Sequence, residues 1–315
     1  MRIVHADSFA IAFPRANMLH PADTRKSVHA WSLIAKCMPA PQLEQLLLPL
    51  DRLATDEELR LVHTQEYLDR LAASPFVADL VEVPLIGVAP FPLLEKFLLT
   101  PMRAAVRGTM LACEAALETG LAASTSGGFH RAGPAAGGGF SVYADAAIAI
   151  ADLRRSGKLG PDDLVGHVDL DAQFGSGLAL CFMNDLRIRL FDMFNDQGYP
   201  RDRVARKRLD TAVPVTPFGG SELYLALLRQ HLPGFLDAQK LRLVIYDAGV
   251  NVVASDWVGG LQLNDADVLE RDRFVIREVT QRGIPLVMLA GGGYIASSHR
   301  LLATTLIWMA QAYAR

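Results

Sequence analysis

The sequence contains only three cysteines among its 315 residues, Cys37, Cys113 and Cys181, and none forms a Cys-x-x-Cys pair. An odd, scattered set of this kind argues against a disulfide framework and against a cysteine-based zinc site. No apolar run reaches the roughly 20 residues that a membrane-spanning helix requires. The opening MRIVHADSFAIAF lacks the basic start and long apolar segment of a signal peptide. We therefore expect a cytoplasmic protein that does not bind a membrane.

The chain also lacks an excess of basic residues, since 31 Lys and Arg face 34 Asp and Glu. Its one basic cluster, within residues 201–208, is interpreted as a solvated loop and helix start, so we expect no nucleic-acid partner. No GxGxxG, GxxxxGK[ST], GxSxG or HExxH motif occurs. Dinucleotide binding, P-loop nucleotide binding, α/β-hydrolase serine chemistry and HExxH-type metalloprotease chemistry therefore have no support.

Short apolar runs alternate with amphipathic stretches along the chain. The runs include residues 3–4, 164–168, 243–246 and 285–290, and the helical stretches include 102–118, 144–155 and 222–231, with Ser221 as the expected N-cap. Apolar runs bounded by turn signals are typical of buried parallel strands. The alternation predicts one α/β domain over residues 1–315, with an open, mainly parallel sheet between layers of helices.

Polar and glycine-rich segments follow these runs, where the ligand crevice of such a sheet lies. The expected polar set is Asp169, Asp171, Gln173, Asn251, His130, Arg131 and Tyr294. Asp169 and Asp171 point to the same side of an extended chain, so burying both requires a cation or hydrogen-bond donors. A metal, Arg131 or backbone N–H groups of the glycine-rich loops could each fill that role. Glycines such as those of 291–293 allow close backbone approach. The histidines His20, His63 and His299 have no chemical context and are interpreted as structural or exposed.

Several of these segments resemble motifs of the histone deacetylase superfamily, in particular its class IV branch. The segments are Gly127-Gly128-Phe129-His130, Gly138-Gly139-Phe140, Asp169 to Gly177, Asp247 to Asn251, Gly291 to Tyr294, Leu19 to Asp23 and Asp256 to Leu261. Arranged by residue number, these segments extend along nearly the whole chain. The resemblance implies the arginase/deacetylase fold, with about eight strands in the sheet. It also implies hydrolysis of acyl-lysine or related amides with one zinc ion.

Carried over residue by residue, the resemblance places the zinc ligands at Asp171, Gln173 and Asn251, where the family has Asp, His and Asp. The paired histidines correspond to His130 and Arg131. Tyr294 occupies the position of the carbonyl-polarising tyrosine, and Asp169 that of the residue that orients a relay histidine. Carboxamides are poor zinc ligands and arginine cannot accept a proton, so we expect weak zinc binding and little conventional turnover.

The resemblance further implies a potassium site, mainly of backbone carbonyls, at Asp169, Asp171, Gln173 and Asp192, which could outlast the loss of zinc. Arg131 is expected to neutralise Asp169 or Asp171 in place of the metal. We expect a small acyl or anionic ligand to be held by Arg131, Gly139, Phe140, Tyr199 and Tyr294. The favoured interpretation is thus a catalytically weak or inactive pseudo-deacetylase. An active metal-dependent deacylase and a scaffold with a vestigial pocket are the alternatives, and the oligomeric state is left open.

Overall fold

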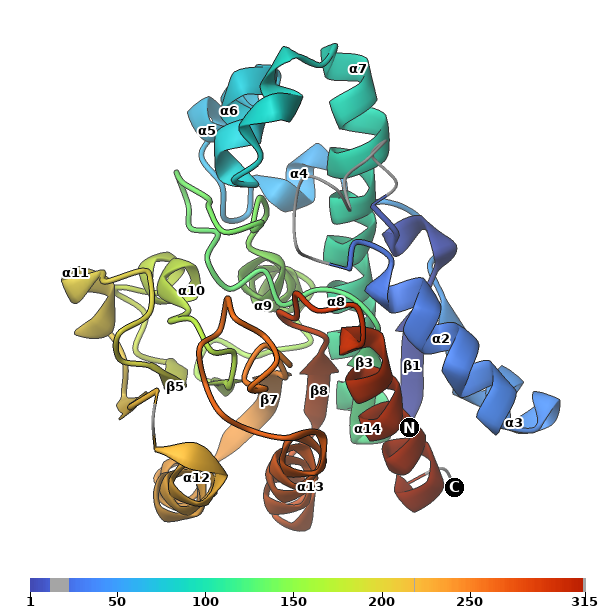
Figure 1. Ribbon diagram of the computed structural model, residues 1–315, viewed down its shortest axis with the longest axis vertical. Helices are drawn as coiled ribbons and strands as arrows, with labels where there is room; N and C mark the ends of the chain where they lie inside the picture. Colours follow the sequence, from blue (N-terminus) through green and yellow to red (C-terminus); the bar gives the residue numbers. More distant parts are fainter. Residues whose placement is uncertain (12–22, 218, 314–315) are drawn as a thin grey trace.

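A sheet of eight parallel strands forms the centre of the computed structural model, which describes residues 1–11, 23–217 and 219–313 (Figure 1). In chain order the strands are β1 (Arg2–His5), β2 (Leu47–Pro49), β3 (Leu121–Ser124), β4 (Leu164–Asp169), β5 (Ile188–Asn195), β6 (Thr211–Val215), β7 (Leu241–Asp247) and β8 (Leu286–Leu289). Their order across the sheet is β2-β1-β3-β8-β7-β4-β5-β6. The predicted α/β domain with a parallel sheet is confirmed.

The central strands β4, β7 and β8 are the ones that the apolar runs predicted. Their branched side chains are buried on both faces, as is usual for strands covered by two helical layers. Sequence patterning missed β2, β3, β5 and β6; of these, β2 is a three-residue edge strand and the run of β5 contains Arg189 and Asp192. A parallel pairing aligns Asp169 of β4 with Asp192 of β5 and with Asp247 of β7, so three carboxylates end neighbouring strands at one level.

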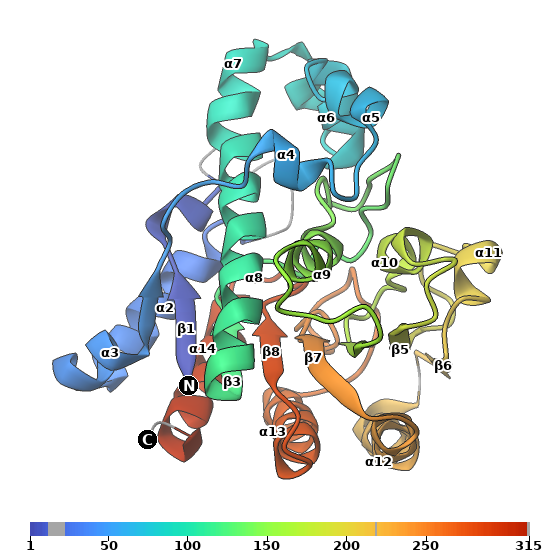
Figure 2. The same cartoon turned by 180° about the vertical axis from the view of Figure 1, so that it is seen from behind.

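Helices cover both faces of the sheet (Figures 1 and 2). One layer contains α2 (Lys26–Cys37), α3 (Ala40–Leu46), α12 (Gly220–Asp237), α13 (Asp265–Gln281) and α14 (Ser298–Tyr313). The other contains α8 (Thr100–Thr119) and α9 (Asp145–Arg155), with α10 (Ser176–Cys181) and α11 (Arg203–Arg206) beside them. Beyond the carboxyl ends of the strands lie η1 (Asp7–Phe9), α4 (Asp56–Leu59), α5 (Gln65–Arg70), α6 (Ser74–Leu80), η2 (Pro84–Val88), α7 (Phe91–Leu94) and η3 (Glu95–Leu99). Each layer packs its own apolar cluster against the sheet.

The predicted helices at 102–118, 144–155 and 222–231 correspond to α8, α9 and α12. The expected N-cap of α12 is wrong, because Gly219 takes that position and Ser221 lies inside the helix. The Ser221 hydroxyl instead donates to the side chain of Asp267 on α13. Asp267 is also the third residue of a capping box with Asn264. Ser221 therefore ties two neighbouring helices together rather than starting one.

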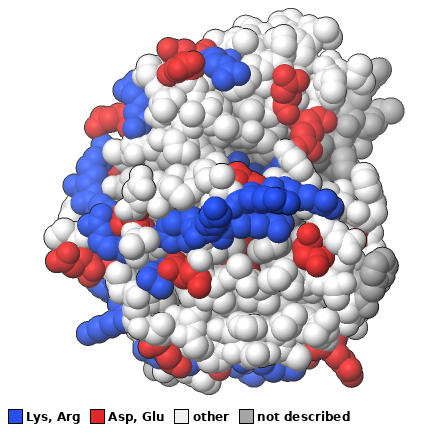
Figure 3. Space-filling view, turned by 90° about the vertical axis from the view of Figure 1, so that its left-hand side faces the viewer, with Lys and Arg blue, Asp and Glu red and all other residues white. Residues whose placement is uncertain are grey.

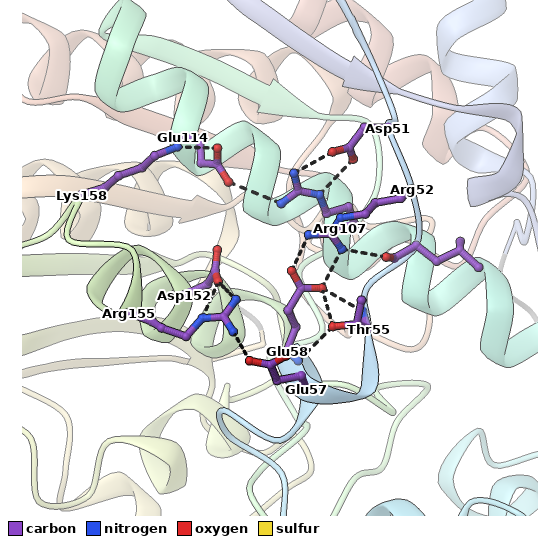
Figure 4. Close-up of polar contacts among 11 residues, drawn as sticks. Asp51, Arg52, Thr55, Glu57, Glu58, Arg107, Glu114, Asp152, Arg155 and Lys158 are labelled. Atoms are coloured by element: carbon purple, nitrogen blue, oxygen red, sulfur yellow. Dashed lines mark hydrogen bonds and ion pairs between the residues drawn. The ribbon is translucent and has the colours of Figure 1, made fainter.

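An ion-pair cluster joins α4, α8 and α9 (Figure 4). Arg107 of α8 donates to both carboxylate oxygens of Asp51, at 2.9 and 2.8 Å. Arg52 similarly donates to both oxygens of Glu58, at 2.8 and 2.5 Å. Burial raises the pKa of Glu58, but the Arg52 guanidinium and the Thr55 N–H outweigh that effect and hold the pKa at about 2. Each carboxylate in these two pairs is thus matched to its own guanidinium.

On the face that carries α11, Lys and Arg side chains gather in a band (Figure 3). In the predicted basic cluster, Arg201, Arg203 and Lys207 are exposed, as expected. Arg208 is buried instead, and its guanidinium donates to the carbonyls of Phe182, Asp185 and Ile188. The absence of a nucleic-acid partner stays a prediction. Within the described ranges, no helix is both long and apolar enough to cross a bilayer.

Candidate active site

The loops that follow β3, β4 and β8 line a cavity of about 120 Å³ beyond the carboxyl ends of the strands, together with residues before and within α2 and α8. His130, Asp171, Gly139, Phe140 and Tyr294 line it, so the structure brings together these five residues from the expected set. Apolar side chains cover much of the remaining wall: Phe9, Ile11, Pro101, Met102, Ala105 and Phe129. The cavity thus has polar groups on one side and a surface suited to hydrocarbon on the other.

Asp171 forms one hydrogen-bonded group, the floor triad, with Gln173 and Asn251, which are not among the residues that line the cavity. The Asn251 amide nitrogen donates to Asp171 Oδ1 at 2.8 Å and to Gln173 Oε1 at 2.6 Å. Asn251 Oδ1 accepts from the N–H of Ala172, and the Gln173 amide donates to the carbonyl of Val258. Both carboxamides therefore have their donors and acceptors occupied within the protein.

Backbone N–H groups complete the surroundings of the Asp171 carboxylate. Oδ1 accepts from the N–H of Gln173 at 2.9 Å, and Oδ2 accepts from the N–H of Gly292 at 2.9 Å. A side chain on Gly292 would collide with Asp171 Oδ2, since a Cβ there would lie 2.3 Å from it. Gly291 adopts a φ of 56° and packs against the backbone of Gly249. The expected close approach of the glycine-rich loop is confirmed, and of the three options its N–H groups do bind the carboxylate.

His130 is oriented by Asp169, whose Oδ2 lies 2.8 Å from the histidine Nδ1. The other ring nitrogen, Nε2, lies 3.8 Å from Asp171 Oδ1. Burial lowers the pKa of His130, but the carboxylates of Asp169 and Asp171 outweigh it and raise that pKa to about 10. The imidazole is therefore a cation near neutral pH. A protonated His130 can donate hydrogen bonds but cannot act as a general base.

Two further buried carboxylates stand behind His130. Asp247 makes no side-chain hydrogen bond to any described residue, and burial together with the Asp169 charge raises its pKa well above the usual range. Asp192 accepts from the N–H of Gly175, its Oδ1 has no partner among the described residues, and burial raises its pKa too. Asp192 belongs to the expected potassium positions. Potassium binding there stays a prediction.

Lys26 on α2 belongs to the site, although the sequence analysis missed it. Its ammonium donates to the carbonyls of Ala290, Gly291 and Gly292, at 3.3, 2.5 and 3.1 Å. Burial lowers the pKa of Lys26 to about 8, and the negative charges of Asp171 and Asp247 oppose that shift. No motif marks this lysine, because it lies in a helix more than 260 residues before the loop that it binds.

The expected role of Arg131 as the charge partner of Asp169 or Asp171 is wrong. Its guanidinium lies 3.7 Å from the carboxylate of Glu82 and stacks over the ring of Tyr199, 4.4 Å from the ring centre. It also packs on the backbone of Gly139, which leaves no room for a Cβ there. The reason is local packing and charge: an aromatic ring, a carboxylate and a bare glycine backbone surround the guanidinium, and Arg131 is not among the residues that line the cavity. Lys26 and His130 supply the cations nearest Asp171.

Tyr294 reaches the cavity from the loop after β8, and its backbone N–H donates to Asp256 Oδ2 at 2.7 Å. Burial and the nearby Asp171 charge raise the pKa of the phenol above its usual value, so the hydroxyl keeps its proton. Phe140, which also lines the cavity, has a φ of 67°. Tyr199 is 66% exposed and is not among the residues that line the cavity. His63 is buried and accepts the N–H of Ala144, which fits the structural interpretation, whereas His20 lies outside the described residues.

The family model described as histone deacetylase domain matches residues 20–309 of the chain. Histone deacetylase 2 of Arabidopsis thaliana is 34% identical over 310 residues, covering 96% of this chain and 77% of the relative. Crystal structures of the HDA15 HD domain and of a histone deacetylase homologue complexed with SAHA superpose with TM-scores of 0.77 each. They are 18% and 20% identical to this chain in sequence. Each match covers 100% of this chain, and it covers 92% of the first solved chain and 84% of the second. The solved structures confirm the fold. Because the family model spans most of the chain and the relative is 34% identical, this chain belongs to the histone deacetylase family.

Proposed function

We propose that this histone deacetylase-like protein binds a small acyl or anionic ligand in its cavity and hydrolyses acyl-lysine weakly or not at all. One observation carries the proposal: the Asn251 amide nitrogen donates to both other members of the floor triad. An amide N–H is a hydrogen-bond donor and offers no lone pair to a metal. The position that the family gives to a third zinc ligand therefore presents the wrong chemistry.

The distances within the floor triad support the same conclusion. With zinc bonds of about 2.0–2.1 Å, neighbouring ligand atoms of a tetrahedral site lie about 3.3 Å apart. The Asn251 nitrogen is 2.8 Å from Asp171 Oδ1 and 2.6 Å from Gln173 Oε1, and both contacts are hydrogen bonds that the amide donates. The donor set, one carboxylate and two neutral carboxamides, is also a poor match to zinc. These residues do not fit a catalytic zinc ion.

The charge of the pocket supports a ligand with a polar or anionic head. Protonated His130 and the Lys26 ammonium both lie at the polar side of the cavity, and Tyr294 offers a protonated hydroxyl there. The apolar lining residues Met102, Phe129 and Phe140 suit a short hydrocarbon chain. An acyl group or a short-chain carboxylate would thus meet hydrogen-bond donors at one end and apolar side chains at the other.

Calorimetric titration of the purified chain with acetate, butyrate, octanoate and an N-acetyl-lysine peptide tests the binding proposal. We expect saturable binding of at least one of them and weaker binding to Tyr294→Phe, which loses only the hydroxyl. Ala105→Leu, which fills the apolar wall, should weaken the longer acids most. Leu85→Ser, at a residue 69% exposed, is the matched control and should bind as the parent chain does. Equal heats for the parent and both cavity variants would overturn the proposal.

The retained His130–Asp169 pair and Tyr294 favour a second candidate, an active deacylase that uses a differently bound metal. An acyl-lysine hydrolysis assay with and without added zinc separates the two candidates. The comparison variant carries Gln173→His, Asn251→Asp and Arg131→His. We expect zinc-dependent hydrolysis in this triple variant and not in the parent chain. Zinc-dependent turnover by the parent at the rate of the variant would favour the second candidate.

A further inference from the structure

A second group of metal-binding side chains lies where α2 meets α14, apart from the floor triad. It comprises Asp23, His29 and His299, which we call the rim triad. Asp23 Oδ2 lies 3.3 Å from Nδ1 of His29 and 3.3 Å from Nδ1 of His299. The two imidazole rings meet edge to face, with centres 5.2 Å apart. All three ligand atoms lie within 4.8 Å of one another, so they surround one point in space.

The chemistry of the rim triad is what transition metals prefer. Imidazole nitrogen and carboxylate oxygen are the standard non-thiolate ligands of zinc, and two histidines with one carboxylate form a common three-ligand set. The two 3.3 Å separations equal the spacing of about 3.3 Å expected between ligands of one tetrahedral zinc ion. The rim triad thus matches on both donor type and spacing, the two criteria that the floor triad fails.

One imidazole nitrogen of the rim triad is buried without a hydrogen-bond partner among the described residues. Nδ1 of His299 is buried and makes no hydrogen bond to any described residue, although the Asp23 carboxylate is only 3.3 Å away. A buried polar atom without a partner is costly, and an ion bound by both groups would satisfy it. The Asp23 side chain is 9% exposed, that of His299 19% and that of His29 43%. An ion could therefore enter from solvent past His29.

We propose that Asp23, His29 and His299 bind a divalent transition metal, zinc in the first instance, at the edge of the cavity. Asp23 also lines that cavity, so the ion would lie beside the ligand pocket. Three protein ligands leave the fourth tetrahedral position to water or to an anionic group of a bound molecule. The proposal does not depend on the proposed function, because no residue is shared between the rim triad and the floor triad.

Titration of the chelator-treated full chain with zinc chloride tests the proposal, with Co²⁺ absorption as a report of tetrahedral coordination. We expect one zinc per chain. His29→Ala and His299→Ala should each weaken binding by at least about tenfold, since even changes behind a ligand cost about 10–100-fold. Asp171→Asn should leave the zinc stoichiometry and affinity unchanged. His231→Ala, a histidine on α12, is the matched control for loss of any imidazole.

Two outcomes would overturn the proposal. The double variant His29→Ala/His299→Ala could bind zinc as tightly as the parent chain, or Asp171→Asn could abolish binding that the double variant retains. The second outcome would place the ion at the floor triad and would count against the proposed function as well. Melting temperatures measured in chelator check that each variant is folded, and His29→Gln with His299→Gln repeats the test with polar replacements. Anomalous diffraction at the zinc edge should locate the ion between the three rim residues.

Discussion

The floor triad and the rim triad each combine one carboxylate with two neutral side chains, and they differ in how completely their polar atoms are hydrogen-bonded to one another. In the floor triad, an amide nitrogen lies 2.6 and 2.8 Å from its neighbours and joins them by hydrogen bonds. In the rim triad, two imidazole nitrogens lie 3.3 Å from a shared carboxylate oxygen, and one of them makes no hydrogen bond within the described residues. The first group satisfies itself, and the second has capacity left for a ligand. Position within a family motif is therefore a poorer guide to metal binding than donor type and spacing.

The largest expected effect comes from giving the floor triad the donors that it lacks. Gln173→His with Asn251→Asp places a second carboxylate beside Asp171 in a buried site. In chelator, we expect the free energy of unfolding to fall by about 3–5 kcal/mol, because the new charge is uncompensated. Added zinc should restore most of that loss by binding the folded state. Urea denaturation with and without zinc measures both effects.

Asn195→Asp provides the matched control for that experiment. Asn195 is 8% exposed, and its amide donates to the carbonyl of Gly259, so it is also a buried, hydrogen-bonded asparagine. Its replacement should destabilise the chain without any recovery in zinc. Recovery of both variants to the same extent would mean that zinc acts elsewhere, and the contrast between the two triads would lose its basis.

Lys26→Met removes the ammonium that lies between the two triads. Three backbone carbonyls would lose their donor, and Asp171 would lose a nearby cation. We expect a loss of about 2 kcal/mol in the free energy of unfolding, in the range for deleting one partner of buried polar groups. Lys26→Arg keeps the charge and should lose less than half as much. Equal losses in the two variants would assign the effect to packing rather than to charge.

The smallest effect is expected in the ion-pair cluster of Figure 4, where every carboxylate of the two pairs already has a guanidinium and no metal is needed. The pKa of Glu58 is about 2 in the folded chain, against its usual 4.5. Its contribution to stability is therefore complete above pH 4.5 and is lost as the pH falls from 4.5 towards 2. Because Arg52 is 42% exposed, solvent screening limits that contribution to about 1–2 kcal/mol.

Glu58→Gln should accordingly destabilise the chain at pH 7 and lose most of its difference from the parent chain as the pH approaches 2, as measured by urea denaturation across that range. Glu57→Gln, whose side chain is 76% exposed, is the control and should match the parent at every pH. A constant difference for Glu58→Gln from pH 7 to pH 2.5 would contradict the assigned pKa.

The sequence was informative wherever function and fold use local patterns. Buried strands such as β4 and β8 are recognisable in the sequence as apolar runs, and the loops after them place Asp171 and Tyr294 in the wall of one cavity. The order of motifs then identified the family. These features are recoverable because the carboxyl ends of parallel strands always meet at one edge of the sheet.

Lys26, the direction of Arg131 and the rim triad could not be predicted, because each depends on contacts between distant segments. Lys26 reaches a loop from another layer of the fold, and Arg131 turns towards Tyr199 for reasons of packing and local charge. His299 was interpreted as structural or exposed because its spacing in the sequence gives it no chemical context. It meets His29 only when α14 packs on α2. Side-chain direction and interhelical contact are set by tertiary packing, which a spacing pattern does not encode.

Lys26 and His29 lie three residues apart, on successive turns of α2, and His299 begins the helix that follows the loop of Gly291 to Tyr294. An ion bound by the two histidines would link the first turn of α14 to α2. It would thereby also hold in place the preceding loop, whose carbonyls accept hydrogen bonds from the Lys26 ammonium. Thermodynamic linkage then requires reciprocity. If the bound ion raises the affinity for a cavity ligand, that ligand must raise the affinity for the ion by the same factor. Ligand binding in the cavity would in this way depend on a metal held by the rim triad, outside the positions that the family uses for zinc.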